Sequence, residues 1–275
     1  FPNPTGAVPD NGAYDPVLNT WTPLTAMPTA RCLLAATMAY IYNPSTFMND
    51  TYVCAIGGYI APADTNVVEC YNVNTGGWTT MSPLQTARRG HGAFFDFMYM
   101  NIKVFGGYNN GAYLNSCEMG TGGAWSPCSA SLSSQRAFFA TVPSGGSDAY
   151  LIGGSNGTDL ATFEKFSGSV TTVLPSLPSP RKALAAAMIS VGGTSRIYAI
   201  GGENGGTDLG NVDEYDLNYG VWLPKGTMSP RSGLVAGSTD YKLLFAIGGK
   251  SGGVVSATNQ AFSVFKKNSY VHVKD

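Results

Sequence analysis

The sequence predicts an all-β fold, a β-propeller of four-stranded blades, and three observations support this prediction. A strand ending in Gly-Gly recurs five times in 275 residues. The Gly pairs are 47 to 49 residues apart, and other landmarks keep the same phase. No stretch has convincing helical periodicity. Because a four-stranded unit cannot bury both faces alone, such units stack radially into a ring. The pairs are Gly57/Gly58, Gly106/Gly107, Gly153/Gly154, Gly201/Gly202 and Gly248/Gly249.

The first half of each repeat is expected to be a turn followed by two strands. An arginine opens it, at Arg31, Arg89, Arg136, Arg181 and Arg231. The first strand is then small and apolar, as in LLAATMAY (33–40), GAFFDFMYM (92–100) and ALAAAMIS (183–190). The second strand ends at Gly-Gly, where a missing Cβ permits positive φ or a close backbone approach.

The second half supplies the third and fourth strands. Ten or eleven residues after each Gly pair stands an acid or amide, in order Glu69, Glu118, Glu164, Asp213 and Gln260. An aromatic residue follows two places later in most copies. The fourth strand carries Trp78, Trp125 or Trp222, with Val170 or Val173, and Tyr270, as candidates in the other units. Tryptophan's large apolar area predicts packing between neighbouring blades.

The order Gly-Gly, Glu-x-Tyr, Trp, Met-x-x-x-Arg resembles the kelch repeat. The clearest copy runs from Tyr198 to Arg231, YAIGGENGGTDLGNVDEYDLNYGVWLPKGTMSPR. The resemblance implies a kelch-type β-propeller over residues 12–273 as a single domain, after an N-terminal extension of residues 1–11.

Closure of the ring has two readings. Residues 12–31 match the second half of a repeat, because Tyr14 and Trp21 are as far apart as Tyr71 and Trp78. The chain therefore holds five full repeats and an N-terminal half-repeat. We favour five blades: the resemblance implies that the Trp21 strand completes the last blade and displaces the tail after Phe265. The alternative is a six-bladed ring whose missing strands lie outside this sequence or come from a neighbouring molecule.

Charge and hydropathy exclude several partner classes. Lys and Arg number 16 and Asp and Glu 17, so the net charge is −1 without blocks of like charge. Nucleic acid and anionic membrane surfaces require concentrated basic residues. No apolar run reaches the roughly 18 residues of a membrane span. We therefore expect no nucleic acid partner and no membrane span.

The cysteines and two sequons favour an extracellular or secreted protein. Five cysteines lie in the first half, and glycosylation sequons begin at Asn49 and Asn156. Placement on the predicted strands favours Cys117 with Cys128, then Cys54 with Cys70; among Cys32, Cys54 and Cys70 only one pair can form. The chain begins at Phe1, so we expect a processed protein or a fragment.

No catalytic or metal-binding set emerges. The two histidines, His91 and His272, are far apart in sequence and lack an accompanying ligand pattern. No nucleophile elbow, phosphate loop or Cys-x-x-Cys motif is present. We expect no metal and no cofactor.

The remaining candidates lie in loops, where blades differ. The kelch resemblance implies that the turn entering the first strand and the loop after Gly-Gly open on one face. That face would hold Arg31, Arg89, Arg136, Arg181, Arg231, Tyr59, Tyr108, Asn109, Glu203, Asn204 and Lys250.

The predicted function is non-catalytic binding of a protein, a glycan or another copy of the chain, including a homo-oligomer or fibre formed by strand exchange. The alternative is a sugar-active kelch enzyme, such as a sialic acid mutarotase, using arginine and glutamate near the channel. Because the arginine recurs in every blade, it is expected to be scaffold.

Overall fold

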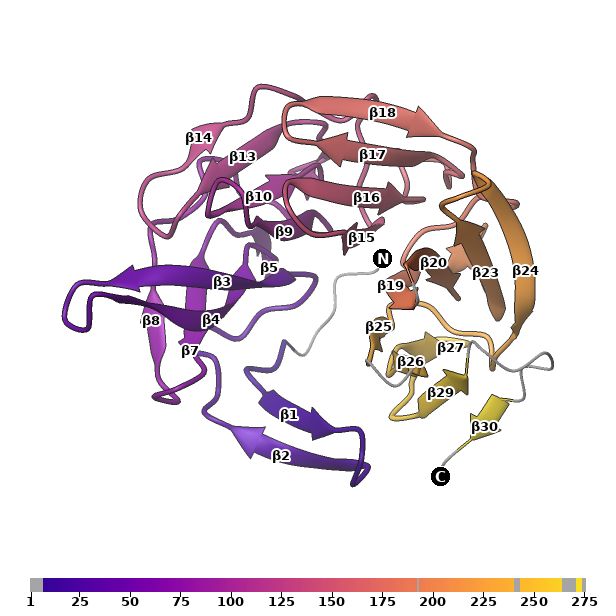
Figure 1. Ribbon diagram of the computed structural model, residues 1–275, viewed down its shortest axis with the longest axis horizontal. Helices are drawn as coiled ribbons and strands as arrows, with labels where there is room; N and C mark the ends of the chain where they lie inside the picture. The colour runs from indigo at the N-terminus through magenta and orange to yellow at the C-terminus, as the bar shows by residue number, and fades with distance from the viewer. Residues whose placement is uncertain (1–6, 192, 240–242, 264–270, 274–275) are drawn as a thin grey trace. The chain divides into compact units, whose positions relative to one another are not determined.

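The computed structural model describes residues 7–191, 193–239, 243–263 and 271–273 and is all-β. Five four-stranded antiparallel sheets form the blades of a five-bladed β-propeller (Figure 1). The residues it describes include no helix, and so none able to cross a membrane. The chain divides into two compact units, residues 1–135 and 136–275, and each is described by itself.

The first unit contains a two-stranded sheet and two blades. The two-stranded sheet is β1 (Asn11–Asp15) with β2 (Thr20–Leu24). The first blade is β3 (Ala35–Asn43), β4 (Met48–Ile56), β7 (Val68–Asn72) and β8 (Trp78–Thr80). The second blade is β9 (Gly92–Asp96), β10 (Asn101–Phe105), β13 (Cys117–Gly120) and β14 (Ser126–Pro127). Short hairpins follow the Gly pairs: β5 (Tyr59–Ile60) with β6 (Ala63–Asp64), and β11 (Tyr108–Asn109) with β12 (Ala112–Tyr113).

The second unit contains three blades. The third blade is β15 (Ala140–Pro143), β16 (Asp148–Ile152), β17 (Phe163–Ser167) and β18 (Val170–Leu174), which lie side by side in chain order (Figure 1). The fourth is β19 (Ala185–Val191), β20 (Thr194–Ile200), β23 (Asn211–Asp216) and β24 (Val221–Thr227). The fifth is β25 (Val235–Ser238), β26 (Leu243–Ile247), β29 (Asn259–Ser263) and β30 (Val271–Val273). The short hairpins are β21 (Glu203–Asn204) with β22 (Thr207–Asp208), and β27 (Lys250–Ser251) with β28 (Val254–Val255).

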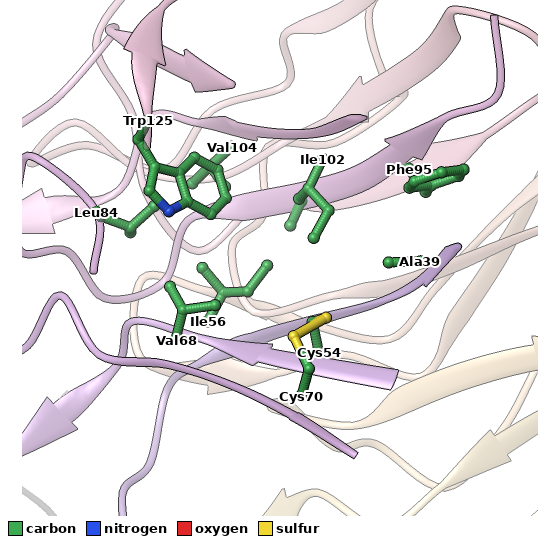
Figure 2. Close-up of a cluster of buried hydrophobic side chains, with 11 residues drawn as sticks. Ala39, Cys54, Ile56, Val68, Cys70, Leu84, Phe95, Ile102, Val104 and Trp125 are labelled. Carbon is green, nitrogen blue, oxygen red and sulfur yellow. A yellow bond between two sulfur atoms is a disulfide. The ribbon is translucent and has the colours of Figure 1, made fainter. Parts of the chain in front are cut away.

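Apolar side chains of neighbouring blades form the core, and tryptophan joins them. In the first unit, Ile56 and the Cys54–Cys70 disulfide face Ile102 and Val104 of the next blade, beside Trp125 (Figure 2). The Trp125 indole Nε1 donates a hydrogen bond to the carbonyl of Ser82 at 2.9 Å. Trp78 donates in the same way to Thr25, and Trp222 to Pro175, both at 2.8 Å. The predicted packing of tryptophan between neighbouring sheets is therefore confirmed.

The β1–β2 sheet is the outer half of a repeat, as predicted, but the predicted closure of the fifth blade is wrong. Tyr14 is paired with Trp21 as Tyr71 is with Trp78. The fourth strand of the fifth blade, however, is β30, which pairs with β29. The chain's own tail thus occupies the edge that we assigned to Trp21; Tyr270 lies outside the described residues.

The first strand of the second blade is shorter than its apolar sequence suggests. We expected a strand over residues 92–100, but β9 ends at Asp96. The Asp96 carboxylate accepts hydrogen bonds from the backbone N–H groups of Met98 and Tyr99, at 3.0 and 3.1 Å. Such a side-chain cap favours a turn over a continued strand. Residues 97–100 consequently form the tip of a hairpin.

Candidate recognition surface

The loops that follow Gly-Gly meet the turns that enter the first strands at one end of every blade, here called the loop end. Backbone bridges link these segments in all five blades: Cys32 with Tyr59, Arg89 with Tyr108, Ala137 with Ser155, Lys182 with Glu203, and Ser232 with Lys250. The approach is close, since a Cβ on Gly154, at φ +105°, would lie 2.8 Å from the carbonyl oxygen of Ala137. Glycine is needed here for both conformation and space.

Beneath the loop end, each blade contains a buried arginine bound to its third strand. Its guanidinium pairs with the acid of the repeat, as between Arg136 and Glu164 at 2.7 Å. It also donates to the carbonyl of the first glycine, as from Arg136 to Gly153 at 3.2 Å. The corresponding pairs are Arg31–Glu69 and Arg181–Asp213, both at 2.6 Å. These arginines are 0 to 3% exposed, so they brace the Gly-Gly turn from below and are not surface contacts.

The fifth blade has an amide in place of the acid. Arg231 donates to the Gln260 side-chain oxygen at 2.8 Å and to the carbonyls of Thr258 and Ala246. Burial lowers the pKa of Arg231 without an opposing carboxylate. Burial also lowers the pKa of Arg136 and Arg181, but there the paired acid opposes the effect. The fifth arginine thus has a neutral amide as its side-chain partner, where Arg136 and Arg181 have a carboxylate.

In the second blade the buried arginine is Arg88, which corrects our assignment of Arg89 to the repeat. The Arg88 guanidinium lies 2.6 Å from Glu118. One additional residue separates this arginine from its Gly pair, so counting back from the glycines gave the wrong neighbour. The preceding turn was the better guide, because Thr-Ala-Arg ends at both Arg31 and Arg88.

Arg89 instead lies at the loop end of the first unit, between two aromatic rings. Its Cζ lies 4.7 Å from the ring centroid of Tyr59 and 4.8 Å from that of Tyr108. Nη1 is 3.2 Å from Asp64, and the Arg89 side chain remains 16% exposed. The Tyr113 ring meets Tyr108 edge to face at 5.2 Å. We call these five residues the Tyr-Arg cluster; its stacking and ion pair hold one cation in a fixed position.

The loop end of the second unit has different chemistry. Lys182 Nζ lies 3.0 Å from Asp159 and 3.4 Å from Glu203, and Lys250 Nζ lies 3.5 Å from Glu203. Burial lowers the pKa of Lys182, but the two carboxylates outweigh it and raise that pKa above its ordinary value. These four residues are the Lys-acid cluster. Asn204 is exposed beside it, and Asn109 is half-buried near Arg89.

Sequence reasoning missed the aspartates that connect adjacent loops. The Asp64 carboxylate accepts a hydrogen bond from the backbone N–H of Asn110 at 3.0 Å. Asp159 accepts from Gly205, and Asp208 from Gly252, both at 2.8 Å. A signal was available, because these aspartates stand five or six residues after the second glycine of a pair.

The cysteines and sequons are placed as follows. Disulfides join Cys54 with Cys70 and Cys117 with Cys128, the two pairs favoured by the sequence. Cys32 is a free thiol whose Sγ lies 3.6 Å from the carbonyl oxygen of Tyr59; burial raises its pKa, although the charge of Arg89 opposes this. Both sequon asparagines, Asn49 and Asn156, are exposed.

The histidines are not brought together in a described site. His91 is buried, and His272 lies in β30, where its side chain is outside the description. Among the described residues, no three His, Cys, Asp or Glu side chains are grouped to hold a metal ion. Comparison with known proteins finds no family model and no curated protein that matches the chain.

Proposed function

We propose that this protein is a non-catalytic recognition module of the kelch type that binds a protein or a glycan through its loop end. The observation that carries the proposal is the Tyr-Arg cluster, where two rings and Asp64 fix a partly exposed guanidinium. A fixed guanidinium edge suits carboxylates and backbone carbonyls, and tyrosine supplies broad contact area with little entropy loss.

The contrast between scaffold and surface supports this function. The arginine beneath each loop repeats in all five blades, whereas the side chains above it differ from blade to blade. The first unit presents tyrosine and arginine, and the second presents lysine, glutamate and aspartate. A constant frame with variable loops is typical of binding proteins, since the frame positions the loops and the loops determine selectivity.

The kelch assignment rests on the repeat itself. The Gly pair, the acid of the third strand, the tryptophan and the arginine recur in order, and each has a structural role in the blade.

An extracellular location is part of the proposal: two disulfides and two exposed sequons support it. Alkylation of the unreduced protein tests the disulfides, with one labelled cysteine expected and five contradicting both pairs.

A glycan array and a peptide array, probed with the purified protein, test the binding function. Arg89→Ala and Lys182→Ala each remove a cation from one cluster, and we expect at least one to weaken binding by about tenfold or more, as loss of a charged contact does. Lys165→Ala is the matched control, since Lys165 pairs with Asp148 away from the loop end. Arg89→Lys keeps the positive charge but removes the planar guanidinium, so it shows whether binding depends on the charge or on the stacked group. Binding that none of these variants alters would contradict the proposal.

The alternative, a sialic acid mutarotase, is tested in the same experiment. Arg136 and Arg181 are buried in ion pairs, and Arg231 is buried with Gln260 as its side-chain partner. Anion binding and proton transfer would therefore have to come from Arg89, Lys182 and Glu203. We expect no mutarotation of sialic acid. Turnover that disappears in Glu203→Gln would replace the binding proposal with the enzyme.

A further inference from the structure

The first unit carries an exposed apolar surface at the end of its blades opposite the loop end. It consists of the tip of the β3–β4 hairpin and the turn between β9 and β10. We call it the turn patch; its members and exposures are Tyr42 58%, Phe47 79%, Met48 69%, Phe97 42%, Met98 71%, Tyr99 61% and Met100 38%. Clusters of this kind are uncommon on monomeric soluble proteins and indicate an interaction site.

The two hairpins are held in place and joined to each other. In the first, the Asn43 side chain accepts a hydrogen bond from the backbone of Ser45 at 2.9 Å; in the second, Asp96 caps the turn. The Tyr40 ring lies 5.8 Å from that of Phe95 and 6.0 Å from that of Phe97, so it connects the blades just below the patch. The patch is therefore pre-organised, which lowers the entropy lost on binding.

Nothing in the repeat requires apolar residues at this position. The equivalent turns of the third and fourth blades have the sequences Ser-Gly-Gly-Ser at 144–147 and Gly-Gly at 192–193. The repeat thus tolerates small polar turns between its first two strands. The aromatic and methionine side chains of the first unit consequently need an explanation other than blade formation.

The patch is also free of charge. Segments 42–48 and 97–100 contain no Asp, Glu, Lys or Arg. The nearest acids are engaged: Asp50 accepts hydrogen bonds from Asn43 and Asn72, and Asp96 pairs with Lys103. An anionic membrane would require cations here. A two-fold interface instead places a patch against its own copy, so an uncharged patch meets itself without repulsion.

We propose that two copies of this chain pair through the turn patch to form a two-fold dimer. With about 200 Å² for each fully exposed side chain, the seven members offer roughly 800 Å². That area is what each partner of a stable interface buries, about 800 Å². Aromatic residues and methionine are enriched at interface cores, and methionine adapts its shape to a partner. The dimer leaves both loop ends uncovered, so it does not depend on the proposed binding function.

Sedimentation velocity of protein made without N-glycans tests the dimer, because a glycan on Asn49 would stand beside Met48. We expect the mass of two chains for the natural sequence at about 10 μM, the range of moderately stable pairs. The double variant Phe47→Ser/Met98→Ser is expected to sediment as a monomer, with a dissociation constant raised about 100-fold or more. The control Val255→Ser removes a side chain that is 86% exposed at the loop end and is expected to stay dimeric.

Three results would overturn the proposal. The natural sequence could sediment as a monomer at about 100 μM, well above the range of a specific pair. The double variant could remain a dimer while its circular dichroism and unfolding midpoint match the parent, which would place the interface elsewhere; Tyr99→Ser provides a second variant. The protein could be monomeric alone and bind neutral phosphatidylcholine vesicles only when the patch is intact, which would make the occupant a lipid surface.

Discussion

Acidification is expected to destabilise the first unit through His91. This side chain is 5% exposed, and among the described residues neither ring nitrogen has a hydrogen-bond partner of good geometry. Burial, with the nearby charge of Arg88, lowers the pKa of His91 from 6.5 to about 3, although the backbone of Arg88 and of Ile56 opposes the shift. Between these two values the unfolded chain binds a proton that the folded chain does not. The free energy of unfolding therefore falls as the pH drops from 6.5 towards 3.

The two pKa values set the size of the effect. Between pH 7 and pH 5, protonation of His91 in the unfolded state lowers the free energy of unfolding by about 2 kcal/mol. For a chain of this size that corresponds to a fall in Tm of roughly 4 to 8 °C. Carboxylates also titrate in this range, so the contribution of His91 must be obtained by comparing the parent protein with variants that lack this histidine.

Urea unfolding at pH 7 and pH 5, followed by tryptophan fluorescence, provides that difference. His91→Phe keeps an aromatic ring and removes the titrating group, so it is expected to lose about 2 kcal/mol less than the parent on acidification. His91→Gln serves if phenylalanine is too large for the site. His272→Gln removes the other histidine and is expected to behave as the parent. Equal losses in the parent and both His91 variants would refute the reasoning.

Three further predictions concern the scaffold. Glu164→Gln leaves Arg136 buried without its acid and is expected to lower the free energy of unfolding, measured in urea, by about 3 to 5 kcal/mol. The control Asp148→Asn breaks a partly exposed pair with Lys165 and is expected to cost under about 1 kcal/mol. Similar costs for the two variants would argue against the bracing role of the buried arginine. Gln260→Glu gives Arg231 a carboxylate and is expected to raise Tm by a few degrees, and a lower Tm would mean that desolvation of the acid dominates. Gly154 and Gly157 share a φ near +105°, but an added Cβ would meet backbone atoms only at Gly154. Gly154→Ala is therefore expected to unfold at a clearly lower urea concentration than Gly157→Ala. Equal unfolding midpoints would exclude a steric effect.

The strands were predictable because their signals are local. Alternation, Gly-Gly and the tryptophan each act within a few residues of where they stand, and the blades follow from them. The end of β9 was not predictable from hydropathy, since residues 97–100 are as apolar as a buried strand. The Asp96 carboxylate outweighs that apolar character by capping the turn. The aspartate is visible in the sequence, but the difference in free energy between a turn capped by it and a longer strand is not.

The candidate surface was harder to predict than the fold. Arg88 and Arg89 are adjacent in sequence, and one is buried while the other lies at the loop end. The number of residues between the arginine and its Gly pair determines which of the two is buried, and this repeat has one additional residue there. The Tyr-Arg cluster depends in addition on contacts between two blades, Tyr59 from one and Tyr108 from the next. Contacts between residues so far apart in sequence depend on how neighbouring blades stack, and a repeat pattern alone does not predict that stacking.

The aspartate links between adjacent loops determine which positions can be redesigned. Each link ends on the backbone N–H of a residue at positive φ, namely Asn110, Gly205 or Gly252, and glycine follows each of them in the turn. These turns and their aspartates must be kept, because few residues adopt that conformation. The two positions before each turn carry no such requirement, and they read Tyr-Asn, Glu-Asn and Lys-Ser. A library randomised at these positions alone would retain the main-chain geometry, so the loop end is suited to display and grafting of new binding specificities.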